Sequence, residues 1–398
     1  MDWQILFPGL SSFLLLEPHV LLLRLALICV GCFLVYMGYK DKLDPMLMIP
    51  LGFSMAVVNA GVLIMDDNSM ANLFVSPLSS GPERLLQDLQ IYFLQPVYNF
   101  AFANGLIACL IFMSIGANAD LDYFIARPFL SLFLALCAEL GTIVTLPVAG
   151  LLGFNFGESA SIAMVGGADG PMVLFASIMM AKHLLVPITV VAYVYLSVCY
   201  AVYPYLIKLL VPRKLRAISM DMPDIQMVSK GQGFAFALIV GVILCILLPV
   251  AAPLFASFFL GSLVKQANIQ RFRTFLDMLL SGTTLFLGFS LGALLTYSIV
   301  AEPSVIWILI LGFFALIVSG IGGILGGLIL CKISGGKINP IIGIAGVSCI
   351  PTTAKVAQKC AMEADETIML LPHAMGVNVA GVITSAIICA LYITFSKM

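Results

Sequence analysis

Charged residues are scarce in this chain: only 10% of its 398 residues are Asp, Glu, Lys or Arg, and the formal net charge is −1. A soluble globular protein carries about 25% charged residues. Hydrophobic residues make up 62% of the chain, and the mean hydropathy is +1.12. This composition excludes an ordinary soluble enzyme, and the lack of a basic excess argues against a nucleic-acid partner.

Histidine is also scarce, with only His19, His183 and His373, which are too scattered to predict a haem or metal cage. The ten cysteines lie mostly inside apolar stretches, where they are expected to be small buried hydrophobic residues rather than disulfide partners. The one C-x-x-C motif, at Cys29 and Cys32, has no second pair to complete a metal site. The sequence contains no nucleotide-binding glycine fingerprint.

Long apolar stretches fill most of the sequence, and about 20 apolar residues suffice for a helix to cross a bilayer. They predict an all-α, polytopic membrane protein with nine to eleven crossings in the cell (plasma or inner) membrane. The most basic loop, 208–230, is expected to be cytoplasmic by the positive-inside rule. We divide the chain into an N-terminal part with transmembrane helices and a polar loop at 66–90 (1–97), a first repeat (98–182), connecting helices with the basic loop (183–271), a second repeat (272–360) and a C-terminal helix (361–398).

The most informative stretch is GGADGP at 166–171, because it places the carboxylate of Asp169 between glycines and a proline inside an apolar run. A charged residue at bilayer depth is costly and normally faces protein or water on an ion path. Glycine and proline weaken helices, and irregular backbone survives in a membrane only where it lines a cavity. We therefore predict a broken or re-entrant segment at 159–180, in which Asp169 binds a transported cation.

An internal repeat is suggested because residues 112–128 resemble residues 289–303 in the spacing of Phe, Gly-Ala and Pro. The offset between Gly116 and Gly292, the glycines of the two Gly-Ala pairs, also places Gly167 on Gly343, inside a second irregular segment at 338–360. Paired interrupted segments are the best sequence indication of a binding site near the membrane midplane. We expect two inverted repeats whose broken segments meet at one site, although chance similarity between apolar helices is the alternative.

The second irregular segment and the last apolar stretch contain neutral oxygen donors that suit a small monovalent cation. The candidates are Asn339, Gly343, Ser348 and Asn378. A structural salt bridge is the alternative role for Asp169. Contacts that only hold helices together are the alternative for the polar side chains.

Four further side chains are candidates for proton transfer, charge neutralisation or ion conduction. Tyr195 has the hydroxyl to transfer a proton or hydrogen-bond a ligand, and Tyr193 lies on a different helix face. Lys355 would neutralise a carboxylate, bind a carboxylate substrate, or only mark the exit into a polar loop. Glu139 and Asp277 are additional acids in apolar surroundings, with an ion path or pairing as their possible roles.

Three motifs occur in a fixed order: GGADGP at 166–171, NPIIGIAGVS at 339–348 and HAMGVNVAG at 373–381. Together they resemble the β subunit of the sodium-translocating, biotin-dependent decarboxylases. The resemblance covers the chain from about residue 112 to its end. It implies that a partner subunit transfers a carboxyl group to biotin, and that this subunit then decarboxylates carboxybiotin, consumes a proton and exports sodium.

The resemblance also implies roles for individual residues. The functional aspartate of the family falls on Asp169, and its tyrosine and arginine fall on Tyr195 and Lys355, which we take as catalytic candidates. Four further functional residues of the family, two asparagines, a glycine and a serine, fall on Asn339, Asn378, Gly343 and Ser348. Together with Asp169 they are the candidate sodium ligands.

Three positions depart from the family pattern. Lys355 keeps the charge of an arginine but loses its bidentate fork. Met172 and Val377 stand where Thr and Pro are expected, so the position near Asp169 lacks a hydroxyl.

The implied partners are a carboxyltransferase, a biotin-carrier subunit and a small membrane γ-type subunit, and we expect a homo-oligomer within that complex. The upstream substrate stays open between oxaloacetate, methylmalonyl-CoA, glutaconyl-CoA and malonate. The main alternative function is a sodium-coupled secondary carboxylate carrier without chemistry, and a passive scaffold or channel subunit is a third.

Overall fold

The structure, a computed structural model, describes residues 13–64, 70–72, 94–102, 104–220 and 228–397. These residues are mostly helical, which confirms the all-α prediction. Within them, a single short hairpin pairs β1 (Val62–Ile64) antiparallel with β2 (Met70–Asn72). The predicted polar loop at 66–90 lies outside the described residues, apart from 70–72.

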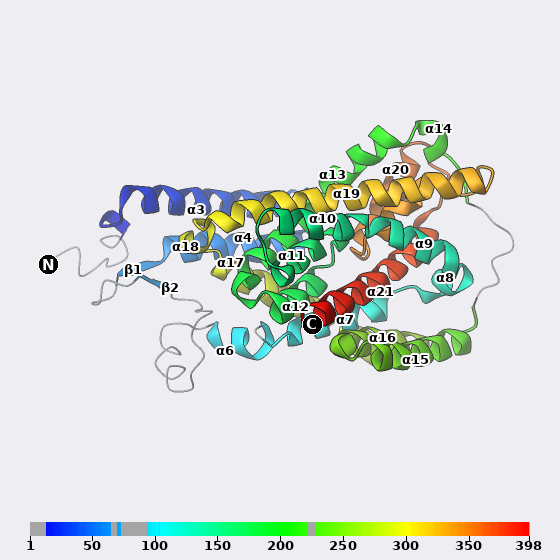
Figure 1. Cartoon of the computed structure of the whole chain (residues 1–398), viewed down its shortest axis with the longest axis horizontal. Coiled ribbons are helices and arrows are strands. Elements are labelled where there is room, and N and C mark those ends of the chain that lie inside the picture. The colour runs from blue at the N-terminus through cyan, green and yellow to red at the C-terminus, as the bar shows by residue number, and fades with distance from the viewer. Residues whose placement is uncertain (1–12, 65–69, 73–93, 103, 221–227, 398) are drawn as a thin grey trace. The chain divides into compact units, whose positions relative to one another are not determined.

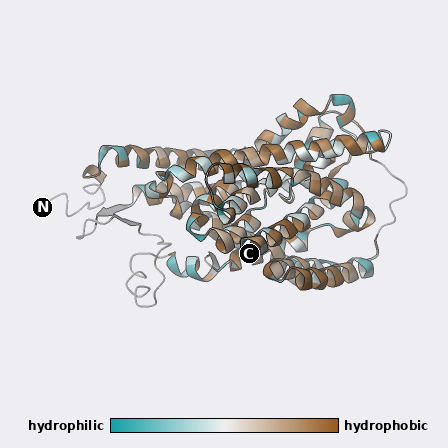
Figure 2. Ribbon diagram, in the orientation of Figure 1, coloured by the Kyte–Doolittle hydropathy of each residue, from teal (hydrophilic) through white to brown (hydrophobic). Residues whose placement is uncertain are grey.

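Most of the long helices are hydrophobic along much of their length, as Figure 2 shows. Five of the described helices are long and apolar enough to cross a membrane: Pro18–Tyr39, Pro128–Leu151, Gln270–Leu294, Pro303–Ile333 and Leu371–Ser396. Two bent helix pairs raise the number to seven: Lys182–Leu196 with Ala201–Leu210, and Gly231–Leu247 with Pro249–Gln266. The chain is therefore a multi-pass membrane protein. The predicted range of nine to eleven crossings is reached only if at least two of three shorter apolar helices (Pro45–Ala60, Leu106–Asn118 and Gly170–Met180) also cross.

The chain forms two compact units, Met1–Ile107 with Ser281–Ile306 and Ala108–Leu280 with Trp307–Met398. In the first unit, α3 (Pro18–Tyr39) packs on α4 (Pro45–Ala60) through Gly31 and Gly52. A β-carbon on either glycine would lie 2.5–2.6 Å from the other's carbonyl oxygen, so only glycine permits this approach. The unit also contains α6 (Gln95–Val97), η1 (Tyr98–Phe102) and α18 (Tyr297–Val300).

The second unit packs around α21 (Leu371–Ser396), which contacts α8, α9, α12, α20 and η5. Its other elements before the basic loop are α8 (Leu121–Ala126), α9 (Pro128–Ala138), α10 (Leu140–Leu151), α11 (Phe156–Ala163), η2 (Met164–Gly167), α12 (Gly170–Met180), η3 (Lys182–Leu184), α13 (Leu185–Leu210) and α14 (Arg213–Arg216). After that loop come α15 (Lys230–Leu247), η4 (Pro249–Ala251), α16 (Ala252–Gln266), η5 (Pro340–Gly346) and α20 (Thr352–Met362). Helices α7 (Leu106–Asn118), α17 (Gln270–Leu294) and α19 (Pro303–Ile333) continue from one unit into the other.

The apolar stretch after the basic loop forms two helices rather than one. Helices α15 and α16 are bent by 118° at their break, which contains Pro249, and lie side by side in Figure 1. The start of α15 meets the end of α16, because a β-carbon on Gly233 would lie 2.8 Å from the side chain of Gln266. The start of α15 and the end of α16 therefore lie at the same end of this helix pair.

The order of elements repeats along the chain. A short helix (α8 or α18) precedes a long span that begins at a proline, either Pro128 or Pro303. A segment interrupted by 3-10 helix (η2 or η5) follows, and then a long helix (α13 or α21). The repeat and the inversion of one copy relative to the other both stay predictions.

Candidate functional site: the junction of two broken helices

The first predicted break is confirmed. Helix α11 ends at Ala163, the 3-10 turn η2 follows, and Ala168 has a left-handed backbone with φ 51°. Asp169 then caps α12, and its Oδ1 accepts the backbone N–H of Met172 at 3.3 Å. The glycines before Asp169 favour this irregular turn, while an aspartate cap and Pro171 in the first turn favour a new helix start.

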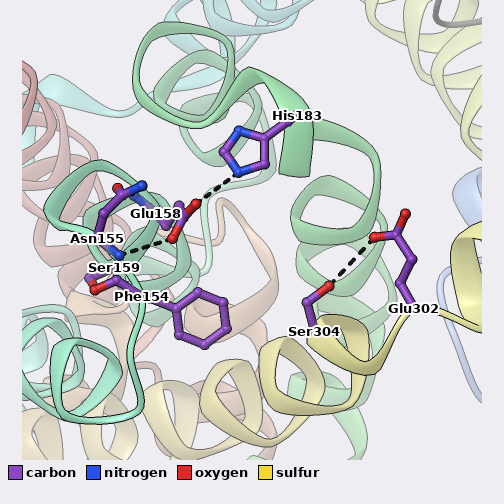
Figure 3. Close-up of polar contacts among 7 residues, drawn as sticks. All are labelled: Phe154, Asn155, Glu158, Ser159, His183, Glu302 and Ser304. Carbon is purple, nitrogen blue, oxygen red and sulfur yellow. Dashed lines mark hydrogen bonds and ion pairs between the residues drawn. The ribbon is translucent and has the colours of Figure 1, made fainter.

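The two ends of the first broken segment are joined by a polar contact. Nε2 of His183, in η3, lies 2.8 Å from Oε1 of Glu158, in the first turn of α11 (Figure 3). Glu158 is itself fixed, because its Oε2 accepts the backbone N–H of Asn155 at 2.9 Å within a capping box. The start of α11 and the residues after α12 therefore lie together, as a re-entrant hairpin requires.

The second predicted break is also confirmed. Asn339 caps η5, after which Val347 is extended and α20 begins at Thr352. Helix α19 approaches η5 closely, because a β-carbon on Gly323 would lie 2.4 Å from the carbonyl oxygen of Gly343. The glycines of α19 therefore bring this irregular backbone against a continuous helix, which shields it from lipid.

The two breaks meet at Ser348. Its backbone N–H and its hydroxyl both donate to the carbonyl oxygen of Gly167, at 3.0 and 2.6 Å. Ser348 Oγ also lies 2.9 Å from the hydroxyl of Ser385 on α21. The expected meeting of the two segments is confirmed. Gly167 and Ser348, which make the contact, are both buried.

A second carboxyl group lies beside this junction. Glu139, at the turn between α9 and α10, is fully buried. Its Oε2 accepts the hydroxyl of Thr142 at 2.6 Å, and its Oε1 is hydrogen-bonded to Ser385. From the sequence, Glu139 is only an additional acid with an ion path or pairing as its possible role, and Thr142 and Ser385 are not candidates. Nothing in the sequence shows which faces of α10 and α21 meet the breaks.

Asp169 is 3% exposed, and its Oδ2 has no hydrogen-bond partner among the described residues. The aromatic ring next to it belongs to Tyr193, because a β-carbon on Gly170 would lie 2.4 Å from Cε1 of that ring. The Tyr193 hydroxyl is likewise buried without a partner in the described part of the chain. Tyr195 instead donates to the carbonyl of Leu309 at 2.8 Å and stacks edge-on against Phe313.

The other predicted ligands lie around the second segment. The amide nitrogen of Asn378 donates to Ala345, Val347 and Thr353, at 2.8–3.0 Å, and its Oδ1 has no partner among described residues. Asn339 donates to the carbonyls of Arg216 and Ile218, and its Oδ1 accepts from Ile341. Lys355 is exposed on α20.

The chemistry available at the junction is limited. Between the described residues, no three His, Cys, Asp or Glu side chains come together as a metal cluster would require. The junction instead offers the unpaired Asp169 oxygen, serine hydroxyls and backbone carbonyls. Hard oxygen donors of this kind suit an alkali or alkaline-earth cation better than a transition metal.

Broken helices that meet at a buried carboxylate inside a polytopic helical protein define the class of ion-coupled membrane transport proteins. The particular family follows from comparison with known sequences. The chain belongs to the family of the Na⁺-transporting oxaloacetate decarboxylase beta subunit, which it matches over residues 23–396. It is therefore one subunit of a multi-subunit complex, and the resemblance inferred from the three motifs is confirmed.

Curated relatives cover nearly the whole chain. The carboxybiotin decarboxylase of Malonomonas rubra is 48% identical over 98% of this chain and 97% of that protein. A probable oxaloacetate decarboxylase beta chain of Vibrio cholerae is 31% identical, covering 93% and 94%. The methylmalonyl-CoA decarboxylase subunit beta of Veillonella parvula is also 31% identical, covering 91% and 90%.

Proposed function

We propose that this chain decarboxylates carboxybiotin carried by a partner subunit and couples that step to sodium export across the membrane. The observation that carries the proposal is the full-length similarity to a carboxybiotin decarboxylase, combined with the buried Asp169 at the junction of two broken helices. The reaction consumes one proton: the bond between the biotin nitrogen and its carboxylate breaks, CO₂ leaves, and the nitrogen takes up the proton.

Asp169 is the proposed principal ligand of sodium. Its unpaired Oδ2 supplies the negative charge, and a buried carboxylate without a partner is costly unless a cation or proton joins it. Ser348 and the unpaired Oδ1 of Asn378 are the proposed neutral ligands. Asn339 and Gly343 are proposed to act through the backbone of the second segment, because the polar atoms of the Asn339 side chain are already hydrogen-bonded.

The proton is proposed to reach the biotin nitrogen through a tyrosine near the first break. Tyr195 is the residue on which the family tyrosine falls, whereas Tyr193 adjoins Asp169. Lys355, exposed on α20, is proposed to attract the carboxylate of carboxybiotin as a point charge. Coupling requires that sodium and the proton stabilise different states of the two breaks.

The partners proposed for this chain are a carboxyltransferase, a biotin carrier and a small membrane γ-type subunit, with several copies of the chain in one complex. The upstream acid is selected by the carboxyltransferase, so oxaloacetate, methylmalonyl-CoA, glutaconyl-CoA and malonate stay open.

The test is to reconstitute the chain with its co-purified partners in liposomes and to measure CO₂ release from free carboxybiotin together with uptake of radiolabelled sodium. We expect sodium-stimulated CO₂ release and sodium uptake in a fixed ratio. Sodium uptake driven by a carboxylate gradient, with no CO₂ release from carboxybiotin, would instead identify a carrier. An empty-liposome control and a sodium ionophore separate transport from leakage.

A further inference from the structure

Glu139 belongs to a row of oxygen atoms whose hydrogens can be counted. The row runs from the carbonyl of Gly167 to Ser348 Oγ at 2.6 Å, to Ser385 Oγ at 2.9 Å, and on to Glu139 Oε1. These three links require three hydrogens, while the two serine hydroxyls supply two. The third hydrogen must come from one end of the row, and a carbonyl oxygen has none to give.

The directions of the three bonds then follow. Ser348 donates to the carbonyl of Gly167, so its oxygen is free to accept from Ser385. Ser385 has then used its hydrogen, and the remaining link needs an O–H on Glu139. A neutral carboxylic acid supplies this hydrogen from Oε1, while its Oε2 still accepts from Thr142 at 2.6 Å.

The surroundings of Glu139 favour the same protonation state. The side chain is fully buried, and none of the ion pairs between described residues involves it. An ionised carboxylate in such a place is costly.

We propose that Glu139 is a neutral carboxylic acid that fastens the two broken segments together through Ser385. Glu139 is then a positioning residue, because it acts on the junction through Ser385 and Ser348. A junction with one carboxylate charge suits a monovalent cation, whereas two charges would favour a divalent one. This consequence for selectivity rests on the proposed function, but the protonation state does not.

The protonation state is tested by infrared spectroscopy of the purified complex. We expect the C=O stretching band of a protonated carboxyl group in the native protein and its loss in Glu139→Gln. Glu158→Gln, which changes a glutamate whose contacts with Asn155 and His183 are those of a carboxylate, is the matched control and should leave the band unchanged. An identical band in the native protein and Glu139→Gln would overturn the proposal.

Turnover gives a second, independent readout. The Glu139→Gln variant would keep both contacts, since its amide N–H donates to Ser385 and its amide oxygen accepts from Thr142. We expect Glu139→Gln to retain sodium-stimulated CO₂ release within about threefold, and Glu139→Leu to lower it at least about tenfold because Ser385 loses its partner. A folded Glu139→Gln without turnover would show that Glu139 must ionise. If the native chain itself shows no turnover, the proposed function fails, and the infrared result still decides the proposal on Glu139.

Discussion

Ser348 gives both of its hydrogen-bond donors to one acceptor, the carbonyl oxygen of Gly167, at 3.0 Å from the backbone N–H and 2.6 Å from the hydroxyl. The two residues belong to different broken segments and lie 181 positions apart in the chain. Because the first break interrupts the helix, the carbonyl oxygen of Gly167 needs a partner other than a helical N–H, and Ser348 supplies two donors to it. A change in the relative position of the two segments therefore has to break or rebuild this contact.

Ser348→Ala should loosen the junction. The variant keeps the backbone bond to Gly167 but leaves that carbonyl and Ser385 each without a hydroxyl partner, at a cost of about 1–3 kcal/mol. We expect a lower unfolding temperature in detergent and weaker stimulation of CO₂ release by sodium. Ser177→Ala is the control, because the hydroxyl of this buried serine donates to the carbonyl of Val173 in its own helix and makes no other hydrogen bond to the described residues. Equal effects of the two variants would contradict a special role for Ser348.

Asp169→Asn tests the charge at the junction while keeping the helix cap, since asparagine caps helices as well as aspartate does. We expect the fold to be retained and the apparent sodium affinity to fall at least about 100-fold, which corresponds to about 2.7 kcal/mol. The measurement is CO₂ release as a function of sodium concentration. Asp120→Asn removes a carboxylate that lies 4.0 Å from Lys265 and belongs to neither broken segment, and should leave the sodium dependence unchanged.

The sequence was sufficient to predict the two breaks because each depends on local chemistry. Glycines before Asp169, an aspartate that caps a helix and a following proline determine a turn almost independently of what packs around it. The family was predictable for a similar reason, since its three motifs can be read directly from the sequence.

The composition of the site was only partly predictable because helix faces are set by packing. Tyr193 and Tyr195 differ by two positions on α13 and therefore point to different sides. Nothing in the sequence shows which side meets Asp169. Ser385 and Thr142 likewise reach Glu139 only because α21 and α10 turn those faces inward. Asn339 carries the oxygen of a cation ligand, yet its side chain is hydrogen-bonded to the backbone around α14 and within η5.

The two tyrosines can be separated by removing each hydroxyl. Tyr195→Phe deletes the bond to Leu309 and should lower stability by about 1 kcal/mol. Tyr193→Phe removes a buried hydroxyl that has no partner among described residues, so stability should stay equal or rise. We expect Tyr193→Phe to change the sodium dependence of CO₂ release, because its ring adjoins Asp169's helix start. If only Tyr195→Phe alters the sodium dependence, Tyr195 rather than Tyr193 is favoured as the tyrosine that transfers the proton.

Gly170→Ala should disturb the junction by steric overlap. The added methyl group would lie 2.4–2.5 Å from Cε1 and Cζ of the Tyr193 ring, which is closer than packed atoms approach. We expect a destabilisation of about 1–3 kcal/mol, measured as a lower unfolding temperature, and loss of sodium-stimulated CO₂ release.

The matched control for that substitution is Gly150→Ala, at a helical glycine where no atom of the described residues lies within 4 Å of the new β-carbon. Alanine is the better helix former by about 1 kcal/mol, so this variant should be at least as stable as the native chain. The double variant Gly170→Ala with Tyr193→Ala removes the overlapping ring, and should therefore recover stability relative to Gly170→Ala alone. A Gly170→Ala protein with native stability and sodium response would show that Tyr193 can move away from Asp169 at no cost, and would contradict a tightly packed junction.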